Sequence, residues 1–326
     1  MKQLLMLVMY LWVPFSFAQD AITNFPSKPV RLVVTTAAGG GSDAIARPLE
    51  QKFSEFLGQP VIIDNRPGAS GMIAMDHVAK SAPDGYTIVF ATTGTIATNY
   101  ALNPKIPYDP LKDFAPITRV ADTYLAFLIN PKLGVNTLEE FVALAKSREK
   151  INKPLTFASY GVGSFAQLVT EWFSTIANIK MIHVPYKGSA PAMTDLIGGQ
   201  VDCFIDTLPS SMPFIKSKQV KAIAVGLEKR GEGVLAEIPT FTEAGYPEFK
   251  PVAWWSLLAP AATPKPIVAK LQQAAAKALQ SQEVKDRFAL ALATPIGNSS
   301  EDFGKFMKSE VDTYVKVVKQ ANIKLD

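Results

Sequence analysis

The stretch Val-Arg-Leu-Val-Val-Thr-Thr-Ala-Ala-Gly-Gly-Gly-Ser-Asp-Ala-Ile, residues 30–45, predicts the fold of the chain. Its apolar, mostly β-branched beginning, Val30–Val34, predicts a strand. Three glycines then follow in a row, at Gly39, Gly40 and Gly41. Glycines let backbone N–H groups approach a bound group without obstruction by Cβ, and a helix start adds unpaired donors and a partial positive charge. The stretch therefore predicts an anion-binding loop, or else an ordinary strand-to-helix turn with Ser42 as N-cap.

Length and charge limit the classes of function. The chain has 326 residues, 48% of them hydrophobic and 19% charged, which is long enough for two globular domains because single cores rarely exceed about 250 to 300 residues. The 33 basic and 29 acidic residues give a net charge of +4 without a basic cluster, so we expect no nucleic-acid partner.

Residues 1–18 predict a signal peptide. Lys2 provides a short positive segment, residues 4–17 are apolar but too few to span a membrane comfortably, and Ser16 and Ala18 offer small residues for cleavage before Gln19. We therefore expect an exported protein.

The sequence offers no metal or cofactor motif. Cys203 is the only cysteine, which rules out an intramolecular disulfide, and its strand-like surroundings predict a buried structural thiol. His77 and His183 lie far apart and belong to no cluster with metal-ligand spacing. We expect neither a metal nor a cofactor.

Strands alternate with helices along the chain, which predicts an α/β fold with mostly parallel sheets and ligands beyond the carboxyl ends of the strands. Thr93 follows a strand at residues 87–91 and is expected on the same rim as the first glycine loop. Strands at 114–120 and 124–129 follow each other directly, so the chain is expected to leave one sheet there for another. A strand at 254–259 is expected to return.

We therefore expect two lobes, each a mostly parallel sheet flanked by helices. The first lobe comprises residues 19–121 and 252–326, and the second comprises residues 122–251. The hinges are expected at about 119–125 and 248–256. Within the first helix, Pro48 predicts a kink or a later helix start because proline removes a hydrogen bond and clashes with the preceding turn.

A second glycine loop repeats the opening pattern. The strand Leu155–Ser159 leads to a loop that contains Tyr160, Gly161, Gly163 and Ser164, and a helical segment follows. Two such loops, one in each lobe, predict anion-binding rims that face each other. Asp206 ends another strand, where it either caps the following helix or accepts hydrogen bonds from a ligand or its waters.

Two enzyme classes are the alternatives to a binding protein. The spacing Gly39-x-Gly41-x-x-Ala44, with Asp64 about twenty residues further on, is compatible with a dinucleotide site, but export removes the protein from the nicotinamide pool. For a hydrolase, the sequence lacks the Gly-x-Ser-x-Gly motif around a nucleophilic serine, and no pattern in the sequence links a serine to a histidine. A hinged binding protein that holds a carboxylate by backbone donors explains the pattern better.

The chain also carries a series of motifs in order, and through them it resembles the substrate-binding receptors of tripartite tricarboxylate transporters, often called Bug receptors. The resemblance runs from about Phe25 to Asp326. Its motifs are Pro26-x-Lys28-Pro29-Val30-Arg31, Ala38-Gly39-Gly40-Gly41-Ser42-Asp43, Asn65-Arg66-Pro67-Gly68-Ala69, Pro83-Asp84-Gly85-Tyr86, His183-Val184-Pro185-Tyr186-Lys187-Gly188, Gly199-Gln200-Val201-Asp202 and Pro239-Thr240-x-x-Glu243-Ala244-Gly245.

The resemblance implies a periplasmic protein with a Venus-flytrap fold, in which two α/β lobes close over an organic acid and present it to a membrane permease, without catalysis. It implies that backbone groups of two loops hold the carboxylate, partly through waters: Ala38 to Ser42 and Tyr160 to Ser164. It also implies that Asp206 lies beside the pocket. The family usually has Pro-Phe-Pro where this chain has Thr35-Thr36-Ala37, so Thr36 replaces an aromatic wall and is expected to admit a larger or more polar acid. We expect a monomer.

Overall fold

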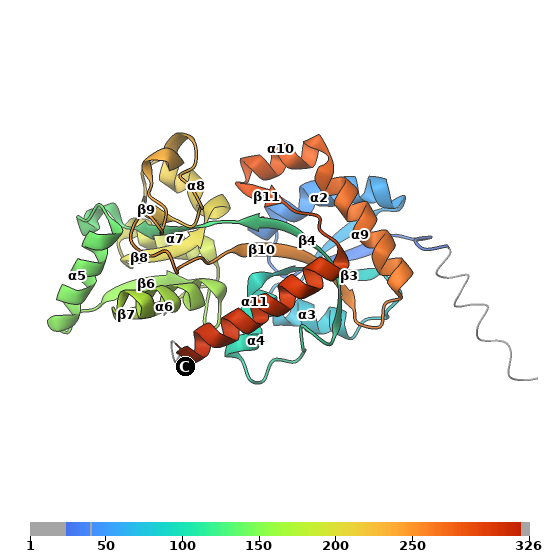
Figure 1. The fold of residues 1–326 in the computed structure, drawn as a ribbon, viewed down its shortest axis with the longest axis horizontal. Coiled ribbons are helices and arrows are strands. Elements are labelled where there is room, and N and C mark those ends of the chain that lie inside the picture. Colours follow the sequence, from blue (N-terminus) through green and yellow to red (C-terminus); the bar gives the residue numbers. More distant parts are fainter. Residues whose placement is uncertain (1–23, 40, 321–326) are drawn as a thin grey trace, which may run out of the picture.

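The computed structural model describes residues 24–39 and 41–320, and the predicted signal peptide lies outside them. The chain forms two sheets flanked by helices, which confirms the two-lobed α/β fold. Figure 1 shows the lobes side by side, with the long strands β4 (Phe114–Thr123) and β10 (Ala253–Pro260) reaching toward their junction. No helix within the described ranges has the length and apolar character needed to cross a membrane.

The first lobe contains a sheet of order β11-β4-β10-β3-β1-β2. Its other strands are β1 (Val30–Val34), β2 (Val61–Asn65), β3 (Thr87–Thr92) and β11 (Ala293–Pro295). Its α-helices are α2 (Gly41–Leu57), α3 (Met72–Ala79), α4 (Asn99–Leu102), α9 (Lys265–Gln280), α10 (Gln282–Leu290) and α11 (Ser300–Gln320), with short helical turns η1 (Ala69–Gly71) and η2 (Gly94–Thr98).

The second lobe contains a sheet of order β7-β6-β8-β5-β9. Its strands are β5 (Leu125–Ile129), β6 (Leu155–Ser159), β7 (Met181–Pro185), β8 (Cys203–Thr207) and β9 (Lys221–Val225). Its α-helices are α5 (Leu138–Lys150), α6 (Phe165–Ala177), α7 (Ser189–Gly198) and α8 (Leu208–Lys216), with short turns η3 (Pro131–Leu133) and η4 (Gly233–Glu237).

Both sheets are mixed, so the prediction of mostly parallel sheets was wrong. β1 pairs in parallel with β2 and β3, and β6 with β7 and β8. The remaining pairs, which involve β4, β5, β9, β10 and β11, are antiparallel. Parallel neighbours need a crossover connection, usually a helix, whereas the strands that carry the chain between lobes run directly from one sheet to the next.

The chain changes sheet within one residue. β4 of the first sheet ends at Thr123 and β5 of the second begins at Leu125, so only Tyr124 lies between them. The consecutive strands expected from the sequence are therefore present, although β4 extends three residues further than predicted. Tyr124 lies in the segment for which a hinge is predicted, and movement about it stays a prediction.

Helix α2 differs from expectation at its start. It begins at Gly41, so Ser42 lies inside the helix and is not its N-cap, and it continues through Pro48, so a later start was also wrong. Ile45, Leu49 and Phe53 bury one stripe of α2 against the first sheet, and this packing outweighs the cost of the proline.

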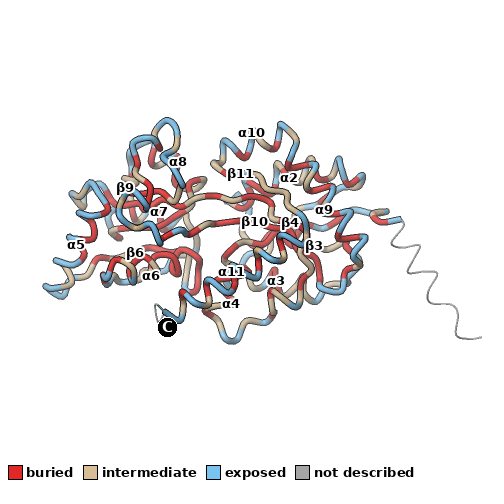
Figure 2. Tube along the Cα trace, viewed as in Figure 1, coloured by how far each residue is buried: buried red, intermediate tan, exposed pale blue. Residues whose placement is uncertain are grey.

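The apolar core continues from one lobe into the other. One cluster of buried residues includes Val33 and Met75 of the first lobe together with Phe127 and Phe173 of the second. Figure 2 shows the buried trace following the strands of both sheets and their junction. Cys203 is fully buried in β8, which confirms the prediction of a structural thiol.

Candidate functional site

A cavity of about 1640 Å³ lies between the lobes. The first lobe lines it with residues 35–39, 41–44, 67–71, 92–95 and 253–255, and the second lobe lines it with residues 186–191 and with parts of α6 and α8. The volume exceeds the roughly 300 to 1,000 Å³ of ordinary small-molecule pockets.

Four helices begin at this cleft. Residues of the first turn, or immediately before it, line the cavity for α2 (Gly41), α6 (Phe165), α7 (Ser189) and α8 (Pro209). The first N–H groups of a helix have no partner within the helix, and the helix dipole adds a partial positive charge there. Helix starts from both lobes therefore favour an anion in the cleft.

A buried carboxylate fixes the first glycine loop. Asp43 accepts hydrogen bonds from the backbone N–H of Gly39 (3.0 Å), from Arg47 Nε (2.6 Å) and from Asn65 Nδ2 (3.4 Å). Burial by itself would raise the pKa of Asp43, but the hydrogen bonds from these three groups outweigh burial and leave that pKa below its ordinary value. Asn65 also donates to the carbonyl of Thr36 (3.0 Å), so one network holds both ends of the loop.

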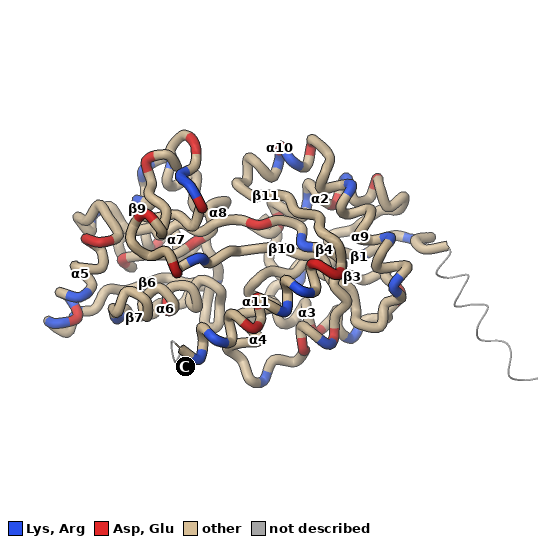
Figure 3. Tube along the Cα trace, viewed as in Figure 1, with Lys and Arg blue, Asp and Glu red and all other residues tan. Residues whose placement is uncertain are grey.

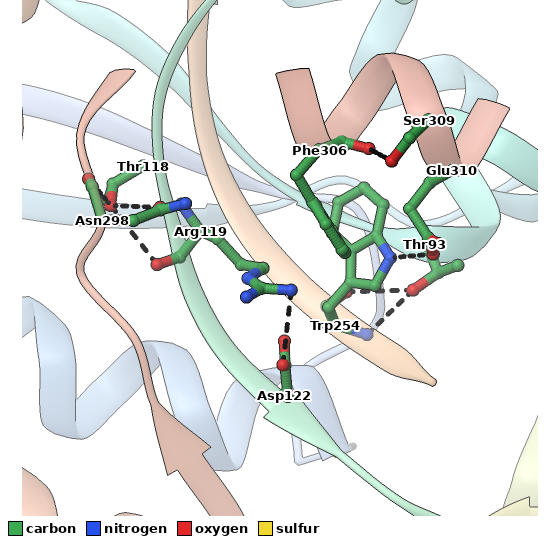
Figure 4. A network of polar contacts seen from close by, with 9 residues as sticks. All are labelled: Thr93, Thr118, Arg119, Asp122, Trp254, Asn298, Phe306, Ser309 and Glu310. Carbon is green, nitrogen blue, oxygen red and sulfur yellow. Dashed lines mark hydrogen bonds and ion pairs between the residues drawn. The ribbon is translucent and has the colours of Figure 1, made fainter. Parts of the chain in front are cut away.

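The two tryptophans of β10 tie the floor of the cleft to the first lobe. Trp255 Nε1 donates to Ser42 Oγ (3.0 Å) at the start of α2. The backbone N–H of Trp254 donates to Thr93 Oγ1 (2.8 Å), and the Thr93 hydroxyl donates to the backbone carbonyl of Trp254 (3.3 Å). The indole Nε1 of Trp254 donates to Glu310 of α11 (2.8 Å), as Figure 4 shows. Both tryptophans are buried, and both also line the cleft.

A partly buried ion pair lies beside this floor. Arg119 pairs with Asp122 at 3.4 Å, and its guanidinium lies 4.0 Å from the ring centre of Phe306 (Figure 4). Burial raises the pKa of Asp122 to about 6, although the charge of Arg119 opposes this shift. Burial likewise raises the pKa of Glu310, against the hydrogen bond from Trp254.

The second glycine loop has its own side-chain supports. Ser164 is the N-cap of α6, where its hydroxyl accepts a hydrogen bond from the N–H of Gln167 (3.4 Å). The side chain of Gln167 in turn accepts from the N–H of Gly163 (2.7 Å). The hydroxyl of Ser159 accepts from the N–H of Gly161 (3.1 Å). The amides of Gly161 and Gly163 are thus already used within the loop.

Asp206 lies beneath this loop and joins three segments of the cleft wall. Its fully buried carboxylate accepts hydrogen bonds from the hydroxyl of Tyr160 (2.5 Å), the hydroxyl of Ser189 (2.6 Å) and the N–H of Thr207 (2.6 Å). Burial raises the pKa of Asp206, although these hydrogen bonds oppose the shift. Burial and the neighbouring carboxylate both raise the pKa of Tyr160, which keeps its hydroxyl a donor.

Comparison with known proteins supplies the family. A model of the tripartite tricarboxylate transporter family receptor matches residues 45–323. The chain belongs to this receptor family. It is 36% identical over 303 residues to protein BugT of Bordetella pertussis, across 93% of this chain and 92% of that protein.

Solved structures of similar proteins share the architecture of this receptor. MatC of Rhodopseudomonas palustris, with bound malate, is 32% identical at a TM-score of 0.81, covering 90% of this chain and 100% of that chain. Rpa4515 of R. palustris, with adipate, is 35% identical at a TM-score of 0.84, covering 92% and 99%. These similarities confirm the predicted periplasmic-binding-protein architecture with two lobes.

Most of the site residues predicted from the sequence line the cleft of the receptor. Those that line it are Thr36, Ala38, Gly39, Gly41, Ser42, Thr93, Tyr160 and Ser164. Gly40 lies outside the described residues. Gly161, Gly163 and Asp206 are not among the lining residues. The capping interpretation of Asp206 was wrong, since Thr207 is the N-cap of α8. The Asp206 carboxylate accepts hydrogen bonds from protein donors, and its contact with a ligand or its waters stays a prediction.

Sequence reasoning missed several residues of the receptor's cleft. Asp43, Asn99, Lys187 and Arg287 line it but were not proposed as site residues. Lys187 lies in the quoted motif His183-Val184-Pro185-Tyr186-Lys187-Gly188, which could have drawn attention to it. Arg287 lies more than 240 residues beyond the first glycine loop, and only the packing of α10 on α2 brings the two together.

The structure gives the enzyme alternatives little support. Asp64 pairs with Arg66 (2.8 Å) and Arg31 (3.8 Å) and does not line the cleft, so the dinucleotide interpretation lacks its acidic residue. Ser159 Oγ lies 2.6 Å from His183 Nε2, but Ser159 is fully buried and neither residue lines the cleft. Within the described part of the chain, no three His, Cys, Asp or Glu residues group as metal ligands would.

Proposed function

We propose that this protein is a periplasmic receptor that captures a small organic carboxylate between its lobes and delivers it to the membrane permease of a tripartite tricarboxylate-type transporter. The observation that carries the proposal is the meeting of four helix starts, from both lobes, at one cleft beside a glycine loop. Malate and adipate in two related structures support a carboxylate as the ligand.

Backbone donors provide enough affinity for such a receptor. Hydrogen bonds to a charged group contribute roughly 1.5 to 3 kcal/mol each, so three or four of them support micromolar binding after the cost of association. We expect the first-turn amides of α2 at Gly41 and Ser42 and those of α7 at Ser189 and Ala190 to provide these bonds, because these residues line the cleft. Arg47 need not contact the ligand, because it already pairs with Asp43.

Thr36 lines the cleft, at the position where the family resemblance implies an aromatic side chain in relatives. Its hydroxyl oxygen is buried and has no hydrogen-bond partner among the described residues, although the residue lines the cleft. A polar group of the ligand, or a water that it carries, could satisfy this oxygen on closure. The proposal thus includes a more polar or larger acid than an aromatic wall would accept.

A thermal-shift and calorimetric screen of mono-, di- and tricarboxylates tests the proposal. We expect at least one acid to raise the melting temperature and to bind with micromolar affinity, and mass spectrometry to recover it unchanged after incubation. Failure of every carboxylate to bind, or the appearance of a product, would contradict the receptor assignment.

A pair of glycine variants tests where the ligand lies. Gly41→Leu places a side chain in the cleft, where the Cβ position is 3.5 Å from Ser210 Oγ of the opposite lobe. We expect it to abolish binding while the melting temperature of the free protein changes little, because Gly41 is helical. Gly198→Leu, in α7 but outside the cleft lining, is the matched control and should bind normally. Binding by Gly41→Leu at wild-type affinity would refute the site.

A further inference from the structure

Beyond the helix starts, the cleft extends along one face of α2. Residues Gly41, Ala44, Pro48 and Gln51 line it at helical spacing, so the cavity follows α2 for ten residues, or about 15 Å. This extension leads away from the glycine loop, and a carboxylate at the start of α2 would leave it open to the rest of the ligand.

Helix α10 forms the outer wall of this extension. Glu283, at its start, pairs with Lys52 of α2 at 3.3 Å, and Figure 1 shows α10 running from there back toward the second lobe. Glu283, Arg287 and Leu290 repeat at intervals of four and three residues and all line the cleft, so one stripe of α10 faces it. Arg287 lies one turn after the Lys52 contact, and therefore roughly level with Pro48.

Among the described residues, Arg287 is a cation without an ion-pair partner. The other charged side chains on this wall are paired, Arg47 with Asp43 and Glu283 with Lys52, whereas among the described residues Arg287 forms no ion pair. Figure 3 shows basic positions on the trace of α10, which contains Lys285 and Arg287. Pro48 lies six positions after Ser42, an offset of about 9 Å along α2, which places Arg287 on the order of 10 Å from the helix start.

From this arrangement we propose that Arg287 selects for a second anionic group, so that the preferred ligand is an elongated dianionic acid whose charges lie about 10 Å apart. The inference rests on the proposed function, because it takes the first carboxylate to bind at the start of α2. A guanidinium suits this role, since its planar fork matches a carboxylate with two parallel hydrogen bonds. Leu290, which is 80% exposed on the same wall, offers apolar contact to the chain between the two charges.

Calorimetry with linear α,ω-dicarboxylates of increasing length, each compared with the monocarboxylate of equal length, tests this inference. We expect wild-type protein to prefer the dicarboxylate at an optimum length, by roughly three- to tenfold for a partly exposed ion pair. Arg287→Gln should lose that preference and leave monocarboxylate binding unchanged. The preference should also shrink at high salt.

Two control variants separate the possible outcomes. Lys285→Gln removes a cation from the same helix outside the cleft lining and should keep the preference. Equal preference in wild type and Arg287→Gln, or its loss in Lys187→Gln instead, would overturn the role of Arg287. If neither acid class binds wild-type protein, the proposed function itself fails, whereas monocarboxylate binding without a preference refutes only the present inference.

Discussion

Replacement of Asp206 separates positioning from charge in the second lobe. In Asp206→Ala, three donors lose their acceptor: the hydroxyls of Tyr160 and Ser189 and the N–H of Thr207. Each lost bond to a buried carboxylate costs about 1.5 to 3 kcal/mol, but relief of the desolvation of that carboxylate and hydration of the two cleft hydroxyls offset part of the sum. We expect the free energy of unfolding to fall by about 2 to 4 kcal/mol.

Asp206→Asn should behave differently, because Oδ1 accepts the bonds from Tyr160 and Thr207 whereas Oδ2 accepts only the bond from Ser189. An amide oxygen in the place of Oδ1 keeps the first two bonds, and the amide nitrogen can donate to Ser189 Oγ. All three pairings survive as neutral hydrogen bonds. We therefore expect a loss of at most about 1 kcal/mol.

Urea unfolding measures the stability of both variants, and calorimetry measures their affinity for the best carboxylate of the screen. If Asp206 acts by positioning, affinity falls at least tenfold in Asp206→Ala and little in Asp206→Asn. Equal loss of affinity in both variants would show that the charge itself matters, and an unaffected Asp206→Ala would refute the positioning role.

Three further predictions follow from the described contacts. Burial raises the pKa of Asp122 from 3.8 to about 6 in the folded state, so the folded state binds this proton more tightly than the unfolded state does. The free energy of unfolding should therefore fall by up to about 3 kcal/mol as the pH rises from 4 to 6. Asp122→Asn should lack this loss in urea titrations across that range. Gly71→Ala puts Cβ 2.4 Å from a Thr95 methyl at a φ of +85° and should cost more than about 2 kcal/mol, whereas Gly134→Ala, at similar φ with open space, should cost about 1 kcal/mol by the same assay. Trp255→Phe removes the hydrogen bond to the start of α2 and should weaken carboxylate binding roughly three- to tenfold in calorimetry, and wild-type affinity would contradict this.

The sequence pattern identified the elements of the fold more reliably than their pairing. Val30–Val34 forms a strand, a helix follows the glycines, and consecutive strands carry the chain between sheets, as the apolar periodicity predicts. Strand direction was predicted wrongly, because antiparallel pairing with β10 joins residues at least 130 positions apart along the chain. Local periodicity carries no information on such partners.

The candidate site, like the fold, was predicted only in part from the sequence. Gly39, Gly41, Ser42 and Ser164 line the cleft as the strand-glycine-helix pattern predicts, since the pattern itself places loops at strand ends. Asp206 was associated with the right site, but its role was not anticipated, because two of its three donors, Tyr160 and Ser189, come from other segments of the chain. Whether each lining residue contacts ligand stays a prediction.

By itself, the stretch at residues 30–45 determined a strand, a glycine loop and a helix whose start favours an anion, because backbone freedom and helix dipoles are local properties. Tertiary structure alone decided what surrounds that anion. Packing places Trp255 on Ser42, the second lobe across from Gly41, and Arg287 along α2. The physical reason is that a cleft between lobes is made of side chains distant in sequence, and only the folded core fixes their distances.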